Sequence, residues 1–352
     1  MRGTILNKIW LALSFAGFCY LVLAYTLGSY VQPKWKVLTE SKHNHANPFN
    51  LVTFFDSSNG LGIGTLTVEK TSDGGKTWIT TLDYNEMAFY SLIFTNQKNG
   101  LIVGTEAKPI SSEDGNQIAN AKNHNPVVLR TEDRGLNWRK VDVDGTTLTS
   151  KDKRFSAFLD ICFDKSGKSW VVGDGGLIES IIENETLKVL NVTYTENPLN
   201  SLSCSESGEV WAVGDDGLVM HLKNNSWTQK YLNKDSFFGK VKVIDNDVWL
   251  VGGIRSKEGT QVKGLLLRSW DNGQTWEDKT PILAEGLFDL YLYENQGWLV
   301  GAKGTIFCTN DRGQTWQREK SPTENDLFTI FFLNQRQGWI GGDRRTVLSL
   351  TK

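Results

Sequence analysis

One short pattern recurs along this chain of 352 residues and constrains its fold more than any other feature. An apolar run ending in glycine, such as Trp298–Gly301 (WLVG), is followed by a tight polar turn and a second apolar run. Apolar runs of this length, bounded by glycine, predict short β-strands. The seven copies lie about 40 residues apart or carry insertions, and they end at Gly64, Gly104, Gly173, Gly214, Gly252, Gly301 and Gly341. Because this period is typical of propeller blades, the sequence predicts an all-β, seven-bladed β-propeller.

Four of these copies are followed by a second motif, S/T-x-D-x-G-x-T-W, known as an Asp box. Thr309–Trp316 is one example, and the four aspartates are Asp73, Asp133, Asp271 and Asp311. A carboxylate in such a turn is expected to accept N–H bonds from its own backbone. The four lie in separate turns about 40 or more residues apart, so they are not expected to bind one metal ion together. We interpret them as structural residues.

The last blade ends at Lys352 without an outer strand of its own. Lys34–Thr39 (KWKVLT) resembles the outer strands that follow the Asp boxes, with Trp35 at the position of Trp78. The sequence therefore predicts a propeller domain over residues 34–352 in which residues 34–39 supply the missing strand of blade 7. Such closure would remove an open sheet edge, which otherwise promotes aggregation.

The N-terminal residues 1–33 differ from the rest of the chain. Ile9–Val31 contains no charged residue and follows Arg2 and Lys8. An apolar run of this length predicts one transmembrane helix, and the preceding basic residues place the propeller on the exported side. A cleaved signal peptide is the alternative, although its apolar region is usually shorter and an A-x-A cleavage site is absent. We expect an uncleaved anchor that crosses the membrane through residues 9–31.

The four cysteines do not form the pattern of a disulfide framework. Cys162 and Cys204 are expected on corresponding strands of neighbouring blades, but offset from each other by about one residue. This offset leaves a disulfide open and favours buried thiols.

Several classes of function are disfavoured. A net charge of −2 disfavours non-specific nucleic-acid binding. His43 and His45 have no third ligand nearby, so neither a metal site nor a cofactor is predicted. Paired carboxylates suggest a glycoside hydrolase, but Asp174, Asp215 and Asp216 lie in the Asp/Gly-rich turns that commonly connect strands. The predicted innermost strands contain no arginine, which also disfavours a sialidase-like enzyme.

The combination of GWLVG with G-T-I-F-x-T-x-D-x-G-x-T-W resembles the photosystem II stability and assembly factor family. The resemblance covers about residues 35–352, and it departs from the family in blades 3 and 4, which lack Asp boxes. It implies a non-catalytic propeller in the periplasm or thylakoid lumen that binds membrane-protein subunits during assembly. We therefore expect a membrane-anchored, monomeric scaffold. The alternatives are a sialidase-like glycoside hydrolase and a peptide-binding receptor domain.

The expected partner-binding residues lie in the loops between the second and third strands of blades 5 to 7. They are Arg255, Lys257, Lys263, Lys303, Arg344 and Arg345. The equivalent turns of blades 3 and 4 are acidic. Because arginine can bind a carboxylate through two hydrogen bonds, the basic side of this face is expected to bind acidic segments of a membrane protein.

Overall fold

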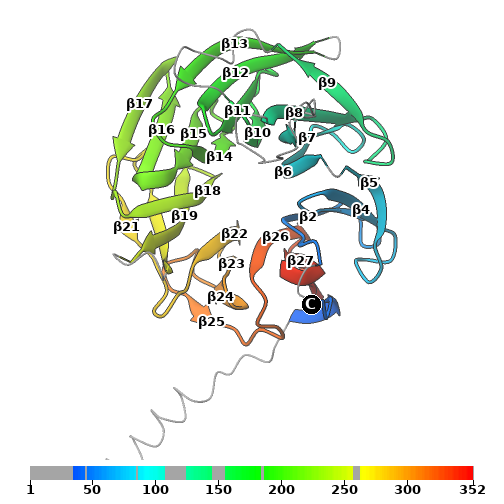
Figure 1. Cartoon of the computed structure of the whole chain (residues 1–352). Helices are drawn as coiled ribbons and strands as arrows, with labels where there is room; N and C mark the ends of the chain where they lie inside the picture. Colours follow the sequence, from blue (N-terminus) through cyan, green and yellow to red (C-terminus); the bar gives the residue numbers. More distant parts are fainter. Residues whose placement is uncertain are drawn as a thin grey trace, which may run out of the picture.

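The computed structural model describes residues 35–43, 46–84, 86–107, 124–144, 155–183, 186–256 and 262–351. These residues form an all-β propeller whose sheets surround a central axis (Figure 1). Within these ranges no helix is long and apolar enough to cross a membrane. The predicted anchor, residues 1–33, lies outside the described part of the chain.

The described strands fall into sets of four, here called blades and numbered along the chain. Blade 1 contains β2 (Leu51–Phe54), β3 (Gly60–Ile63), β4 (Thr67–Thr71) and β5 (Ile79–Asp83). Blade 4 contains β14 (Leu199–Cys204), β15 (Val210–Gly214), β16 (Leu218–Lys223) and β17 (Ser226–Tyr231). Blade 5 contains β18 (Ser236–Ile244), β19 (Asp247–Arg255), β20 (Val262–Ser269) and β21 (Glu277–Asp278). Blade 6 contains β22 (Leu287–Tyr293), β23 (Gln296–Gly301), β24 (Thr305–Thr309) and β25 (Gln317–Arg318).

Blades 2 and 3 share one eight-stranded sheet. Blade 2 contains β6 (Met87–Phe94), β7 (Gly100–Ala107), β8 (His124–Thr131) and β9 (Arg139–Val143). Blade 3 contains β10 (Phe158–Phe163), β11 (Ser169–Gly173), β12 (Gly176–Glu183) and β13 (Thr186–Tyr194). The two are joined at the periphery, where β13 and β9 pair in parallel over two residue pairs. All other pairings inside the blades are antiparallel, as expected for strands joined by short turns.

Blade 7 is built from both ends of the described chain. It contains β26 (Leu327–Asn334), β27 (Gln337–Gly342), β28 (Val347–Thr351) and, at its outer edge, β1 (Trp35–Thr39). β1 pairs antiparallel with β28, with Trp35 opposite Leu350, and it lies beside the C-terminus in Figure 1. The Trp35 ring is buried against blade 6, with its centroid 6.3 Å from that of Trp298 and in an edge-on arrangement. The outer strand therefore lies where the sequence placed Lys34–Thr39.

The repeated glycine has a specific steric reason. In blade 6, Gly301 pairs with Leu287, and the register of β22 then shifts by one residue. A Cβ atom at Gly301 would lie 2.2 Å from the carbonyl oxygen of Gly286, which is too close for any side chain. The same approach occurs at Gly104, Gly173, Gly214, Gly252 and Gly342. In blade 7 the equivalent residue is therefore Gly342, which pairs with Leu327, and the assignment of Gly341 is corrected.

The Asp boxes close the turns before the outer strands through local hydrogen bonds. Asp311 accepts bonds from the Thr315 N–H at 2.9 Å and from the Thr309 hydroxyl at 2.7 Å. Asp73, Asp133 and Asp271 accept equivalent bonds in their own turns. Bonds from Thr77 to the carboxylate lower the pKa of Asp73 to about 2. The Trp78 indole N–H donates to the Gly75 carbonyl at 3.0 Å, so the ring folds back over the turn.

Cys162 in β10 and Cys204 in β14 form a disulfide, with their Cα atoms 5.8 Å apart. The expectation of two buried thiols is therefore wrong. The one-residue offset in the sequence is present. The innermost strands of the two blades are staggered by the same amount, because the Asp160 carboxylate of β10 accepts a bond from the N–H of Leu202 in β14, one position beyond the equivalent residue Ser201. This stagger places the sulfur atoms of Cys162 and Cys204 next to each other. Cys308 is buried and, among the described residues, is not part of a disulfide.

Candidate functional site

The predicted basic residues do not form one continuous patch. Arg255, Lys263 and Lys303 line a groove between blades 5 and 6. Arg344 and Arg345 lie in the turn between β27 and β28 of blade 7. Lys257 is outside the described residues. The described residues of the prediction thus fall into a groove between blades 5 and 6 and a separate turn of blade 7.

The groove lies between the β19–β20 hairpin of blade 5 and the segment that leads from β21 into β22 of blade 6. Its volume is about 1480 Å³, which exceeds the range of roughly 300–1,000 Å³ that is usual for small-molecule sites. Apolar side chains form much of its surface: Phe237, Ile254, Val262, Pro281, Ile282, Leu283, Ala284 and Phe288. A surface of this size and composition suits a chain segment better than a metabolite.

Positive charges lie along the groove. The Arg255 guanidinium lies 4.7 Å from the centre of the Phe237 ring and 3.4 Å from Asp215. Lys303 forms an ion pair with Glu285 at 2.9 Å, yet 75% of its side chain remains exposed. Lys263 and Arg318 are exposed as well, and the acidic lining residues are Asp278 and Glu285. The four basic side chains outnumber these two acids, so the groove carries a positive charge over an apolar surface.

Arg345 does not behave as the sequence suggested. Its guanidinium donates to both carboxylate oxygens of Glu69, a buried residue of β4, with one bond of 2.6 Å and one of 2.5 Å. It also lies 5.4 Å from the centre of the Phe49 ring. Arg345 therefore joins blade 7 to blade 1, and its guanidinium is engaged with Glu69. Arg344, in contrast, is 41% exposed and has only a 3.7 Å approach to Asp343.

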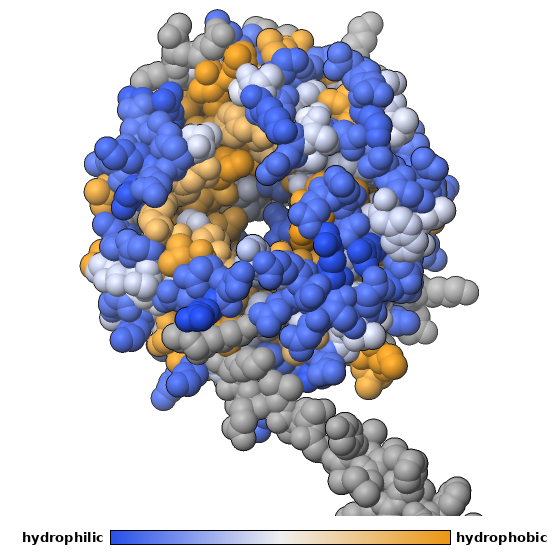
Figure 2. Space-filling model, turned by 180° about the vertical axis from the view of Figure 1, so that it is seen from behind, coloured by the Kyte–Doolittle hydropathy of each residue, from blue (hydrophilic) through white to orange (hydrophobic). Residues whose placement is uncertain are grey.

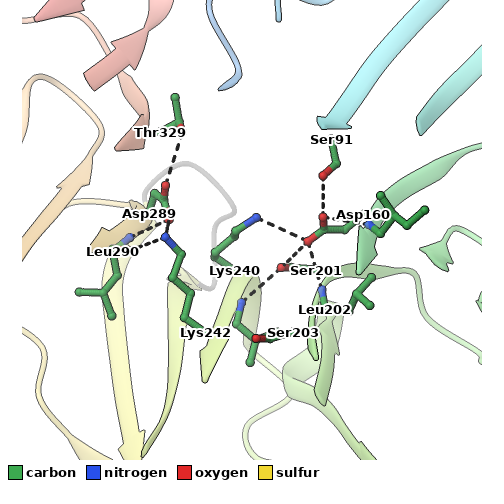
Figure 3. Close-up of polar contacts among 12 residues, drawn as sticks. Ser91, Asp160, Ser201, Leu202, Ser203, Lys240, Lys242, Asp289, Leu290 and Thr329 are labelled. Carbon is green, nitrogen blue, oxygen red and sulfur yellow. Dashed lines mark hydrogen bonds and ion pairs between the residues drawn. The ribbon is translucent and has the colours of Figure 1, made fainter. Parts of the chain in front are cut away.

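A polar cluster that the sequence analysis missed lies on the innermost strands (Figure 3). Asp160 is buried and accepts hydroxyl bonds from Ser91 at 2.7 Å and from Ser201 at 2.8 Å. On the opposite side of the cluster, Lys242 pairs with Asp289 at 2.7 Å, and Asp289 accepts the Ile330 N–H at 3.0 Å. These contacts link the innermost strands of blades 2 to 7 to one another across the blade boundaries.

Lys240 lies between the two aspartates of this cluster. Its ammonium group is 3.5 Å from Asp160, and the charge of Asp160 raises the pKa of Lys240. These side chains line a small cavity of about 160 Å³ at the axis, where the space-filling view shows a central opening (Figure 2). The signal in the sequence was a polar residue at the same position of the innermost strands, namely the third residue of FLDI, LNSL and LFDL.

Of the carboxylates considered for glycoside hydrolysis, Asp174 lies in the turn between β11 and β12, whereas Asp215 and Asp216 share the turn between β15 and β16. Asp174 accepts N–H bonds from Ser156 at 3.0 Å and from Ala157 at 3.3 Å. Asp215 accepts a bond from the Asn200 amide at 3.0 Å and contacts Arg255. Both therefore hold neighbouring loops in place. Over the described ranges, no group of three or more His, Cys, Asp or Glu side chains could hold a metal ion.

The strands and turns together define an Asp-box β-propeller. Comparison with solved structures agrees with this class and also shows a more specific similarity. A structure described as "YCF48 bound to D1 peptide" superposes with a TM-score of 0.65 at 21% identity, covering 92% of this chain and 98% of that one. YCF48 from Cyanidioschyzon merolae gives a TM-score of 0.64 at 18% identity, covering 90% and 98%. At these identities the similarity establishes the propeller fold.

Sequence comparison gives partial matches to proteins of the same name. Residues 277–351 match the family model for "Photosynthesis system II assembly factor YCF48", a range that extends from β21 to the end of β28. The photosystem II assembly lipoprotein Ycf48 of Nostoc sp. is 28% identical over 130 residues, or 35% of this chain and 36% of that protein. The photosystem II assembly protein Ycf48 of Thermosynechococcus vestitus is 32% identical over 84 residues, or 22% and 24%. The aligned regions thus span about a third or less of these relatives, and the predicted resemblance to the assembly factor family is confirmed.

Proposed function

We propose that this protein is a non-catalytic scaffold in photosystem II assembly that binds an exported segment of a membrane-protein subunit. The observation that carries the proposal is the match of residues 277–351 to the photosystem II assembly factor model. The matched range contributes the blade 6 side of the groove, including Ile282, Leu283 and Lys303. The part of the chain that matches the assembly factor model thus also contributes to the candidate binding surface.

The names of related proteins indicate the kind of partner. One solved relative is described as bound to a D1 peptide, and the Nostoc relative is named a lipoprotein. By analogy, the partner of this chain is a segment of a photosystem II subunit, and the site includes the basic residues Arg255, Lys263, Lys303 and Arg344. Lys257, which lies outside the described ranges, remains part of the proposed site.

The architecture of the proposed scaffold is a seven-bladed propeller held at the membrane through residues 9–31. The sheet topology supports the number of blades. The Cys162–Cys204 disulfide supports a location on the exported side, the periplasm or thylakoid lumen, because disulfides persist mainly in oxidising compartments. The absence of catalysis is supported by the structural use of Asp174 and Asp215, which hold loops in place.

Titration of a fluorescently labelled D1 peptide into the full-length protein in detergent tests the proposal. We expect saturable binding with a Kd of about 1 μM, roughly −8 kcal/mol, which weakens as salt rises because charges contribute. A scrambled peptide of the same composition is the control. Equal binding of the two peptides, or none, would contradict the proposed function.

A further inference from the structure

The groove between blades 5 and 6 contains the two most exposed large apolar side chains of the described residues. Ile282 is 89% exposed and Leu283 is 80% exposed, and the neighbouring Val262 is 41% exposed. Single exposed apolar residues are common on protein surfaces, but a group of them in one concave site marks an interaction surface. Their position therefore points to a partner with apolar side chains of its own.

The backbone presents this apolar pair in a fixed turn. The Ala284 N–H donates to the Pro281 carbonyl at 3.2 Å, so Ile282 and Leu283 are the two central residues of a β-turn. Leu283 has a φ of +59°, a conformation that turns usually assign to glycine or asparagine. The turn is attached to blade 5 by the bond from the Gly264 N–H to the Ala284 carbonyl at 3.0 Å. A bulky apolar residue thus occupies an exposed position that neither burial nor backbone preference explains.

The charges around this turn restrict the chemistry of the occupant. Lys263 is exposed, Lys303 is 75% exposed, and Arg255 and Arg318 lie on the walls of the same groove. Only Asp278 and Glu285 among the lining residues carry negative charge. An apolar surface with a basic rim is complementary to a segment that combines apolar and acidic side chains.

We propose that this groove is a recognition site for an extended segment of a partner protein in which apolar residues adjoin one or more carboxylates. Ile282 and Leu283 contact the apolar residues, and Lys263 and Lys303 bind the carboxylates. The inference rests on the proposed function for the existence of a protein partner and adds the location and chemistry of the contact. A lipid surface is the main competing occupant of an exposed apolar pair with basic neighbours.

The test compares a groove variant with a matched control. Ile282→Ser with Leu283→Asn removes the apolar pair but keeps a residue that tolerates the turn. Ile79→Ser, at a side chain that is 71% exposed in β5 of blade 1, is the apolar control. Lys263→Glu tests the charge, with Lys234→Glu as its control at another exposed lysine. All variants are full-length proteins in detergent, and thermal unfolding verifies that each is folded.

The probes are the D1 peptide and a phage-displayed library of random peptides selected against the unmodified protein. We expect the selected peptides to combine apolar and acidic residues and to bind the groove variant and Lys263→Glu about tenfold more weakly. The two control variants should bind them like the unmodified protein. Unchanged peptide binding in both groove variants would contradict the proposal that the groove is the recognition site. A library selection that enriches no peptides with apolar and acidic residues would contradict it as well.

Two further outcomes separate the inference from the proposed function. If the D1 peptide binds the unmodified protein and the groove variants equally, the groove is not the recognition site, while the proposed function stands. If binding of the selected peptides requires the groove residues but the D1 peptide does not bind, the proposed function fails, and the groove remains a peptide-recognition site. Sedimentation with phosphatidylglycerol vesicles tests the lipid alternative: a loss of vesicle binding in the Ile282→Ser, Leu283→Asn variant without a loss of peptide binding would assign the surface to the membrane instead.

Discussion

Arg344 and Arg345 are adjacent in sequence and have different roles in the structure. The side chain of Glu69 is only 2% exposed, and the fork of Arg345 satisfies both of its oxygens. A buried carboxylate without such a partner is costly, because its charge is no longer compensated after removal from water. Arg344 extends into solvent beside Asp343. Removing Arg345 should therefore lower the stability of the fold far more than removing Arg344.

Arg345→Ala is expected to lower the free energy of unfolding by about 3 kcal/mol, because it leaves Glu69 buried and unpaired. Arg344→Ala should change it by less than about 0.5 kcal/mol, as is usual for exposed side chains. Urea unfolding followed by tryptophan fluorescence measures both. Equal stabilities for the two variants would show that the Glu69 pair is not structural. Arg344→Glu, rather than a double reversal that includes Arg345, is thus the suitable test of partner binding at this turn.

At the scale of the element, blades 2 to 7 share a bulge near the start of the innermost strand, whereas β2 of blade 1 pairs without one. The register shifts in β6, β10, β14, β18, β22 and β26. In each strand the shift follows directly after the residue that pairs with the repeated glycine of the second strand. A bulge bends the strand and redirects its side chains. It brings the carbonyl that precedes the glycine's pairing partner close to the repeated glycine and turns the next polar residue, such as Asp160 or Asp289, toward the axis.

A pair of glycine substitutions tests this geometry. Gly301→Ala would place a methyl group 2.2 Å from the Gly286 carbonyl oxygen, so we expect a loss of about 1–3 kcal/mol or more. Gly239→Ala, in the bulge of β18, is the control because an added Cβ would meet no atom within 4 Å. This second change should be neutral or slightly stabilising. Thermal unfolding of both variants decides the matter, and a Gly301→Ala protein as stable as the parent would refute the steric argument.

For the whole molecule, the ring is held by contacts between neighbouring blades and closed in blade 7. Polar bonds connect the innermost strands from β6 round to β26. Blades 7 and 1 meet through the Arg345–Glu69 pair and through aromatic packing, with Phe54 stacked 3.7 Å from Trp339. The last blade would have only three strands without β1. Trp35 of β1 is also buried in the core shared by blades 6 and 7. The N-terminal strand thus contributes both an edge and part of a core.

Deletion of Trp35–Thr39 from the full-length protein should expose the edge of β28 and leave the Trp35 site empty. We expect a lower melting temperature and aggregation, because an unpaired strand edge can pair with another chain. Lys36→Ala is the control, since Lys36 is exposed in the same strand. Size-exclusion chromatography and thermal unfolding are the measurements. A monomeric deletion variant with an unchanged melting temperature would mean that β1 is dispensable for closure.

The sequence by itself determined the repeat, the strands and the Asp boxes, because each depends on interactions within a few residues. Asp311 binds groups between Thr309 and Thr315, and the alternation of apolar runs and glycine needs no distant partner to be recognised. The similarity of Lys34–Thr39 to other outer strands also indicated the position of β1, because the outer strands that follow the Asp boxes share one sequence pattern.

Only the tertiary structure decided which distant residues meet. The stagger between blades brings Cys162 and Cys204 together, and the contact of blade 7 with blade 1 places Arg345 on Glu69. The groove joins Arg255, Lys263 and Lys303 to the Ile282–Leu283 turn, and the bulges gather Asp160, Lys240 and Asp289 at the axis. Each of these arrangements depends on how one blade is rotated against the next. A repeat pattern does not contain that rotation, because it describes every blade separately.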